Sequence, residues 1–146
     1  MIARETYTER ETRTVARAIA AEARAGGIYC LVGGLGAGKT AFTKGFAEGL
    51  SIADDVTSPT FGIINEYDGK LNLYHFDVYR ILSIDEMEDT GYEEYFYGDG
   101  VCLIEWADMI AALIPENAVW ITITKDFEKG ADYRKIEISE KGGNAL

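Results

Sequence analysis

The chain has 146 residues, 47% of them hydrophobic, and a formal net charge of −11. This length predicts one domain, residues 1–146, with a single hydrophobic core, and no apolar run approaches the roughly 18 residues of a membrane span. Because proteins grip a phosphate backbone with clustered Lys and Arg, the acidic balance argues against direct binding of DNA or RNA. The first residues also lack the apolar core of a secretory signal, so we do not expect secretion.

The first element predicted along the chain is a helix. Thr8 followed by Glu11 has the spacing of a capping box, a signal for a helix start. The helix is expected to run to about Ala25, where two glycines follow. Val15 and Ile19 are the apolar positions expected on its buried edge.

A glycine-rich motif follows the first apolar run, residues 28–32, which is typical of a buried strand. The sequence Gly33-Gly34-Leu35-Gly36-Ala37-Gly38-Lys39-Thr40 fits the pattern G-x-x-x-x-G-K-[ST] at every fixed position. Behind it, Phe42, Phe46 and Leu50 recur every fourth residue, as on the apolar face of a helix. A strand, a glycine loop and a helix are the context that confirms this motif, so the sequence predicts binding of a nucleoside triphosphate.

The residue types of this loop suit the chemistry of phosphate binding. Backbone N–H groups must point at phosphate oxygens, and Gly33, Gly36 and Gly38 can take positive φ and let the backbone approach closely because they lack Cβ. Lys39 is expected to reach the β- and γ-phosphates, and Thr40 to offer its hydroxyl to Mg²⁺. The residues predicted to bind the nucleotide are Gly33, Gly34, Leu35, Gly36, Ala37, Gly38, Lys39, Thr40 and Ala41.

The middle of the chain predicts a hairpin. Two strand-like runs, 62–67 and 71–79, flank Asp68-Gly69, which is a strong signal for a two-residue hairpin turn. In front of them, Ser58-Pro59-Thr60-Phe61 is a loop. The hydroxyl of Thr60 is expected to sense Mg²⁺ and the γ-phosphate, as switch loops do.

The second half alternates short helices with strands. The expected elements are a helix at 83–87, a loop with a short helix at 91–100, a strand at 101–104, a short helix that turns Met109, Ile110 and Leu113 inward, strands at 118–124 and 133–139, and a frayed tail at 141–146. Cys30 and Cys102 lie in apolar strand-like runs, which predicts buried free thiols. Together the elements predict an α/β, P-loop NTPase-like fold of three layers, with a mixed central β-sheet flanked by helices.

Two acids complete the predicted site. A phosphate loop needs an acid that holds Mg²⁺ and a group that places the attacking water, and Asp77 and Glu105 each end an apolar strand, where α/β sheets bind ligands. We expect Glu105 nearer the metal and Asp77 nearer the water, so the predicted metal site is Thr40, Asp77 and Glu105. For His75 the sequence favours core packing over function, and for Trp106 packing and contact with nucleotide are equally open.

The segment from Ile81 to Thr124 contains no Lys or Arg. Its acidic residues are Asp85, Glu86, Glu88, Asp89, Glu93, Glu94, Asp99, Glu105, Asp108 and Glu116. Such a segment repels nucleic acid and suits a basic protein partner, while a solvated face that keeps the protein soluble explains it equally well.

Across nearly its whole length the sequence resembles the TsaE family, small P-loop ATPases of bacterial tRNA threonylcarbamoyladenosine synthesis. The matching segments, in order, are Gly36 to Thr40, Ser58 to Phe61, Tyr74 to Arg80, Glu94 to Phe96 and Leu103 to Trp106. The first is shared by all P-loop proteins. The second, third and last are specific in this order and in so short a chain.

The resemblance implies an ATPase, weak alone, that binds ATP or ADP with Mg²⁺ and docks onto the proteins TsaB and TsaD. It implies a cytoplasmic protein, in which hydrolysis resets this complex and tRNA is met only through it, with no membrane and no DNA involved. The catalytic residues that it implies are Lys39, Thr60, Asp77 and Glu105. It places Trp106 near the nucleotide and leaves the adenine contacts open, for which we choose Arg134 and Lys135.

Two other P-loop functions fit the sequence less well. A small-molecule kinase shares the loop but usually needs an arginine-bearing lid, and residues 81–124 offer no arginine. A GTPase needs Asn-Lys-x-Asp for guanine, and the nearest match, Asn65-Glu66-Tyr67-Asp68, has Glu in place of Lys. The small-molecule kinase stays as the alternative to the ATPase.

Overall fold

The computed structural model describes residues 2–34, 36–57, 63–79, 81 and 83–140. Its strands are β1 (Ile2–Thr6), β2 (Ile28–Val32), β3 (Ile64–Tyr67), β4 (Leu73–Asp77), β5 (Val101–Glu105), β6 (Val119–Lys125) and β7 (Arg134–Glu140). Its helices are α1 (Glu9–Ala21), α2 (Lys39–Gly49), α3 (Ile84–Glu88), α4 (Tyr92–Phe96) and the 3₁₀ helices η1 (Ala107–Leu113) and η2 (Phe127–Lys129).

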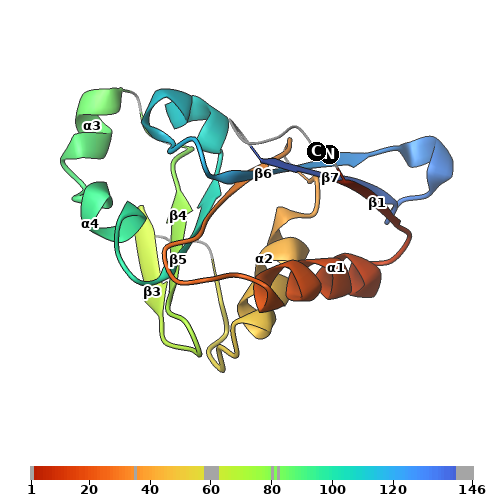
Figure 1. Ribbon diagram of the computed structural model, residues 1–146. Coiled ribbons are helices and arrows are strands. Elements are labelled where there is room, and N and C mark those ends of the chain that lie inside the picture. Colours follow the sequence, from red (N-terminus) through yellow and green to blue (C-terminus); the bar gives the residue numbers. More distant parts are fainter. Residues whose placement is uncertain (1, 35, 58–62, 80, 82, 141–146) are drawn as a thin grey trace.

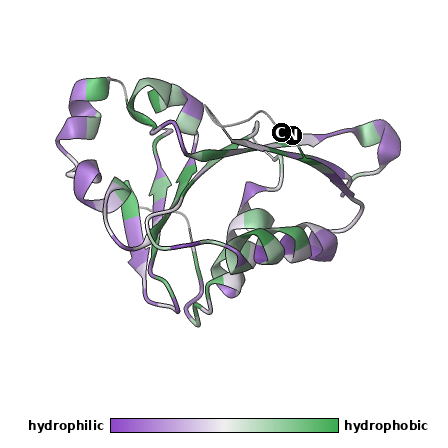
Figure 2. Ribbon diagram, viewed as in Figure 1, coloured by the Kyte–Doolittle hydropathy of each residue, from purple (hydrophilic) through white to green (hydrophobic). Residues whose placement is uncertain are grey.

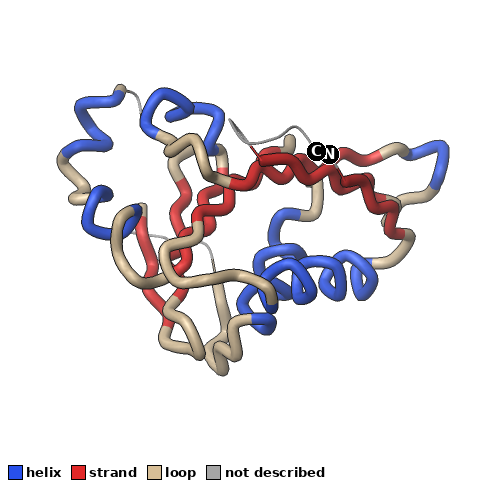
Figure 3. The backbone as a smooth tube through the Cα atoms, viewed as in Figure 1, coloured by secondary structure: helices blue, strands red, loops and turns tan. Residues whose placement is uncertain are grey.

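The strands form one twisted mixed sheet in the order β1-β7-β6-β2-β5-β4-β3 (Figures 1 and 3). The four central strands β6, β2, β5 and β4 run parallel, whereas β3, β7 and β1 pair antiparallel at the two sides. The predicted α/β fold with a mixed sheet is therefore confirmed. Because the central strands are parallel, their carboxyl ends meet at one edge, where such sheets bind ligands.

The sheet divides the apolar interior into two layers, as expected for a sheet flanked by helices on both faces. On one face, Leu31 and Leu103 pack with Phe42 and Phe46 beneath α1 and α2. The other face contacts α3, α4 and η1 through a second cluster around Phe76. Side chains alternate between the faces of a strand, and both layers need apolar residues, which is why the central strands are largely hydrophobic (Figure 2).

The first strand, β1, has no counterpart among the predicted elements. It pairs antiparallel with β7 at the edge of the sheet, and four of its five side chains are exposed. An edge strand that buries so little has no apolar alternation, so the usual signal of a half-buried strand is missing.

Helix α1 begins as predicted but packs differently. The capping box is present, because Thr8 Oγ1 accepts from the Glu11 N–H at 3.1 Å, but the helix ends at Ala21 rather than about Ala25. Its buried face is Thr12, Ala16 and Ala20, while Val15 and Ile19 are only partly buried.

Two glycines of α2 explain this close packing of α1. A Cβ at Gly45 would lie 2.3 Å from the carbonyl oxygen of Arg13, and one at Gly49 would lie 2.5 Å from that of Arg17. The two helices lie side by side (Figure 1), and their backbones approach so closely that only glycine fits at these two positions of α2.

The hairpin of β3 and β4 is confirmed, but its predicted two-residue turn is wrong. Tyr67 pairs with Leu73, so five residues lie between the strands. The Lys70 N–H donates to the carbonyl of Leu50 at 2.8 Å, and a Cβ at Gly69 would lie 2.5 Å from the same oxygen. The turn is therefore shaped by its contact with the end of α2, which a local pattern does not reveal.

Three other predictions have a mixed outcome. Of the three side chains of η1 that were predicted to point inward, only Ile110 is fully buried, whereas Leu113 is partly buried and Met109 is 46% exposed, because a 3₁₀ helix has a different period from the α-helix assumed for the pattern. Cys30 and Cys102 are buried free thiols as predicted, and burial raises the pKa of Cys102 to about 12. The tail from Lys141 lies outside the described residues. Within the described part of the chain, no helix has the length and apolar character needed to cross a membrane.

Candidate functional site

The glycine loop, Gly33–Thr40, connects the end of β2 to the start of α2. Gly36 and Gly38 have φ angles of +76° and +98°, and Gly38 is the N-cap of α2 with no side-chain cap. Gly33 does not have positive φ, but a Cβ there would lie 2.9 Å from the carbonyl oxygen of Ile123. The three glycines are therefore needed for two different reasons, left-handed backbone at two positions and a close approach at the third.

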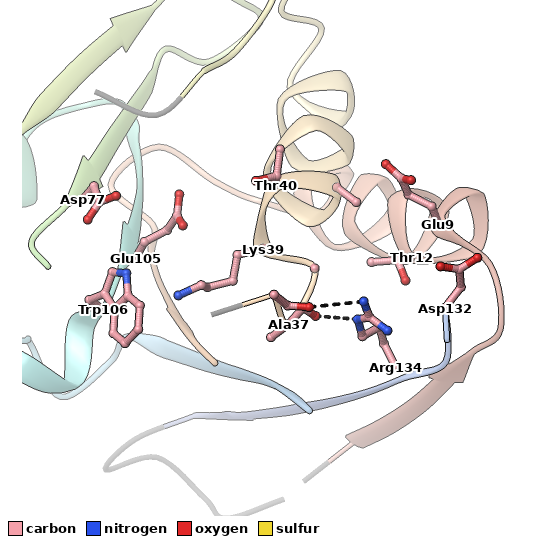
Figure 4. A pocket seen from close by; sticks show the side chains of 13 residues that line it. Glu9, Thr12, Ala37, Lys39, Thr40, Asp77, Glu105, Trp106, Asp132 and Arg134 are labelled. Carbon is pink, nitrogen blue, oxygen red and sulfur yellow. Dashed lines mark hydrogen bonds between the residues drawn. The ribbon is translucent and has the colours of Figure 1, made fainter. Parts of the chain in front are cut away.

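Arg134 of β7 holds the loop from outside. Its Nε donates to the carbonyl of Ala37 at 2.7 Å and its Nη2 to that of Gly36 at 3.3 Å (Figure 4). Within the loop, the Ala37 N–H donates to the carbonyl of Gly34 at 3.1 Å. These contacts fix the loop in front of α2. The first N–H groups of α2 have no acceptor within the helix, so they can bind an anion.

A pocket of about 440 Å³ opens at this loop. It is lined by Glu9, Thr12, Gly36, Ala37, Gly38, Lys39, Thr40, Ala41, Asp77, Glu105, Trp106, Asp132 and Arg134. Figure 4 shows Asp77, Glu105 and Trp106 at one end, with Glu9 and Asp132 at the other. Lys39, Thr40 and the loop lie between these ends.

Lys39 is buried at the centre of the pocket, with 8% of its surface exposed. Its Nζ donates to the carbonyl of Gly33 at 2.9 Å and lies 3.5 Å from the centre of the Trp106 ring. Burial lowers the pKa of Lys39, and the carboxylates of Glu105, Asp77 and Asp108 oppose that shift. A desolvated ammonium is a strong binding group for an incoming anion, and the nearby carboxylates help to keep Lys39 charged.

The acid end of the pocket is made by two neighbouring strands. Asp77 and Glu105 are paired across β4 and β5, so their side chains lie on the same face of the sheet. Asp77 Oδ1 accepts from the Tyr79 N–H at 3.0 Å. The Glu105 side chain is 8% exposed and its Oε2 lies 2.6 Å from Nε2 of His75, which is itself 1% exposed.

Trp106 closes the pocket beside the two acids. It has a left-handed backbone, with φ of 64° and ψ of 30°, which is uncommon for a bulky residue. The backbone N–H of Trp106 donates to the carbonyl of Leu31 at 3.2 Å. The Trp106 ring packs against the Tyr79 ring with 4.6 Å between their centres. The backbone turn after Glu105 therefore directs the indole ring toward Lys39 (Figure 4).

Ten of the residues that the sequence assigns to the site line this pocket together: Gly36, Ala37, Gly38, Lys39, Thr40, Ala41, Asp77, Glu105, Trp106 and Arg134. Gly33 and Gly34 support the loop without lining the pocket. Leu35 and Thr60 lie outside the described residues. Lys135, chosen with Arg134 for the adenine, is not among the lining residues.

Sequence reasoning missed four residues of the site. Glu9, Thr12 and Asp132 line the pocket but belong to no motif, and only the packing of α1 against α2 brings the first two there. His75 was visible as the histidine between two aromatics on a strand that ends in an acid. The alternation along β4 puts it on the same face as Asp77, which is the signal that could have found it.

The residues present fit a nucleotide with Mg²⁺. The N–H groups at the start of α2 and the buried Lys39 ammonium, which line the pocket, suit the phosphates. Among the described residues no group of three His, Cys, Asp or Glu could hold a metal by itself. A site made of Thr40, Asp77 and Glu105 would therefore be completed by phosphate oxygens and water, as Mg²⁺ prefers.

Comparisons with known proteins agree with each other. The family model described as "Threonylcarbamoyl adenosine biosynthesis protein TsaE" matches residues 6–136. A Bacillus subtilis (strain 168) protein named tRNA threonylcarbamoyladenosine biosynthesis protein TsaE is 51% identical over 138 residues, covering 94% of this chain and 84% of its own. A Treponema pallidum (strain Nichols) protein of the same name is 48% identical over 98 residues, covering 67% and 73%. The crystal structure of YdiB from Bacillus subtilis matches with a TM-score of 0.77 and 43% identity, covering 99% of this chain and 88% of that one.

Proposed function

The chain belongs to the TsaE family, and we propose that it is an ATP-binding and ATP-hydrolysing subunit of the machinery that makes threonylcarbamoyladenosine in tRNA. One observation carries this proposal. Lys39 and the start of α2 face the same pocket of about 440 Å³ as Asp77 and Glu105. An anion site beside two acids at the carboxyl edge of a parallel sheet is what hydrolysis of a nucleoside triphosphate requires.

Each residue has a proposed role. The N–H groups of the glycine loop and the Lys39 ammonium bind the phosphates. Thr40 and Glu105 hold Mg²⁺ with Asp77 nearby, and Asp77 orients the attacking water. When bound, Mg²⁺ would supply the positive charge that neutralises the β- and γ-phosphates. Thr60 remains proposed as the switch-loop hydroxyl.

The remaining lining residues fit the rest of the nucleotide. Arg134 lies on the loop's outer side with its guanidinium against Ala37 and Gly36, and we keep it as a nucleotide-binding residue. Trp106 lies over Lys39, where an aromatic ring excludes water from the phosphates and strengthens their attraction to the ammonium.

We propose that the partners are TsaB and TsaD, that tRNA is met only through them in the cytoplasm, and that hydrolysis resets the complex. The docking surface includes the acidic segment 81–124, where Glu93 and Glu94 are exposed on α4. Of the four aromatics at residues 92–97, Tyr97 is 71% exposed, whereas Tyr92 and Phe96 are buried and Tyr95 is partly buried. The acids and Tyr97 are therefore the groups left for a partner.

Charge reversal tests this surface. Glu93→Lys with Glu94→Lys should weaken binding to a TsaB–TsaD pair and leave ATP binding intact, because α4 is remote from the glycine loop. A matched control reverses Glu22 and Glu128, which are exposed outside the segment. Unchanged affinity of the α4 variant for the pair would refute the docking surface.

The proposed activity is tested by phosphate release from ATP and from GTP, measured with the chain alone and then with a TsaB–TsaD pair. We expect release that is selective for ATP, rises with the pair and disappears in Lys39→Ala. Release that the pair leaves unchanged would instead favour a small-molecule kinase, and small-molecule acceptors would be screened next.

A further inference from the structure

Glu105 has a proposed role beside Mg²⁺, but its hydrogen bond with the buried His75 has none so far. His75 is the single histidine of the chain. It lies two residues before Asp77 on β4, and Asp77 pairs with Glu105 of β5. Since alternate residues of a strand share a face and paired residues point the same way, all three side chains lie on the sheet face that carries the pocket.

The chemistry of the pair fixes the direction of its hydrogen bond. A carboxylate can only accept, so the Nε2–H of His75 donates to Glu105 Oε2 over 2.6 Å. In the described part of the chain, the other ring nitrogen, Nδ1, is buried without a partner. The geometry of this contact therefore places a proton on Nε2, facing Glu105 Oε2.

This bond determines what Glu105 can do. A carboxylate that is only 8% exposed must be held by donors or a cation, and Lys39 lies within electrostatic reach of it. Lys39 instead donates to the carbonyl of Gly33. With Oε2 held by His75, Glu105 keeps its position at the wall of the pocket and presents its other oxygen, rather than turning to neutralise the ammonium that binds phosphate.

We propose that His75 is a positioning residue, which holds Glu105 in the orientation that the site needs and keeps it from pairing with Lys39. This inference rests on the proposed function, since the role it gives to Glu105 is that of the acid beside Mg²⁺. Residues that hydrogen-bond a metal-holding carboxylate typically change metal affinity or activity about 10- to 100-fold when they are replaced.

The kinetic test compares three variants in ATP hydrolysis and in ADP binding. His75→Leu removes the donor, and turnover should fall about 10- to 100-fold with ADP affinity changed less than about threefold. His75→Gln keeps an N–H donor near the position of Nε2 and should recover most of the turnover. Phe76→Leu is the matched control, because Phe76 is buried at the next position of the same strand but in the opposite layer. Wild-type turnover in His75→Leu, no recovery in His75→Gln, or an equal loss in Phe76→Leu would each overturn the proposal.

A second measurement needs neither a variant nor activity. With ¹⁵N-labelled histidine, a single ring gives the spectrum, so no assignment is required. We expect a proton on Nε2 that exchanges slowly with water, because Nε2 donates to the buried Glu105 carboxylate. An Nε2 that carries no proton, or an Nε2 proton that exchanges freely with water, would overturn the proposal. If the wild-type protein hydrolyses no ATP even with TsaB and TsaD, the proposed function fails, while the spectrum still reports on the hydrogen bond of His75. If the wild-type protein hydrolyses ATP and His75→Leu does so at the same rate, this inference alone fails.

Discussion

The two sides of the pocket are built in different ways. The loop side, Gly33–Thr40, is one run of consecutive residues between β2 and α2. The acid side brings Asp77 and Glu105 together from β4 and β5, with His75 behind them. The loop side depends on local backbone geometry at Gly36 and Gly38, whereas the acid side depends on the register of a parallel strand pair.

This difference separates binding from chemistry. The loop side offers N–H groups and one ammonium, which attract phosphates whether or not a reaction follows. The acid side offers carboxylates, which repel phosphate and are useful only for a metal ion and a water molecule. Variants on the loop side should therefore lose binding and turnover together, and variants on the acid side should lose turnover alone.

The largest effect is expected from Lys39→Ala. It removes the buried ammonium beside Glu105 and with it the charge that meets the phosphates. Turnover should fall about 10²- to 10³-fold, as for loss of a principal electrostatic group, and ATP affinity should fall with it. Phosphate release and ATP titration check this, with Lys44→Ala as a control that removes a charge from the same helix away from the pocket. ATP binding at wild-type affinity would erase the proposed division between the two sides.

Asp77→Asn should show the opposite pattern on the acid side. The side chain keeps its shape and an oxygen for the Tyr79 N–H but loses the charge that would orient water. Turnover should fall about 100-fold, with ATP affinity equal to or above that of the wild type because a like charge is removed. Asp99→Asn, an exposed acid outside the pocket, is the matched control. Joint loss of binding and turnover would show that Asp77 belongs functionally with the loop.

Gly33→Ala tests whether the loop is limited by space. The new methyl group would lie 2.9 Å from the backbone oxygen of Ile123, whereas one at Gly34 would meet nothing within 4 Å. Overpacking of this kind costs about 1–3 kcal/mol of unfolding free energy, so the melting temperature of Gly33→Ala should fall by several degrees while that of Gly34→Ala stays unchanged. Equal melting temperatures would mean that the loop relaxes freely and that its geometry is less constrained than the acid side.

The same contrast explains what could be predicted from the sequence. The loop and the apolar face of α2 were predictable because every determinant lies within about 20 residues, and Phe42 and Phe46 are indeed fully buried. Asp77 and Glu105 were predictable as strand ends that share one site, but not as paired positions of adjacent strands, because strand order is a tertiary property. Alternation along β4 places His75 on the face of Asp77, but its hydrogen bond to Glu105 depends on a distant strand. The five-residue turn held by Leu50 and the edge strand β1 also depend on distant residues, for which local patterns carry no signal.

The smallest effect, a small loss of stability, is expected from Glu48→Gln. Glu48 lies between α1 and α2 and belongs to neither side of the pocket. Burial pushes the pKa of Glu48 up, but hydrogen bonds from Arg13 and Arg17 outweigh it and lower the pKa below 4.5. A carboxylate with a lowered pKa stabilises the fold above its unfolded value and loses that contribution as pH falls through the folded value.

The ion pairs of Glu48 measure 3.0 and 3.3 Å but are about 39% exposed on the Glu48 side, so solvent screening limits their contribution to at most ~1 kcal/mol. Urea unfolding should show this difference between wild type and Glu48→Gln at pH 7, and it should vanish at a pH well below 4.5 and shrink in high salt. Turnover should not change, because the pair only fastens α1 to α2. A loss of turnover in Glu48→Gln would show instead that the packing of α1 against α2 affects catalysis in the pocket, through Glu9 and Thr12 of α1, which line it.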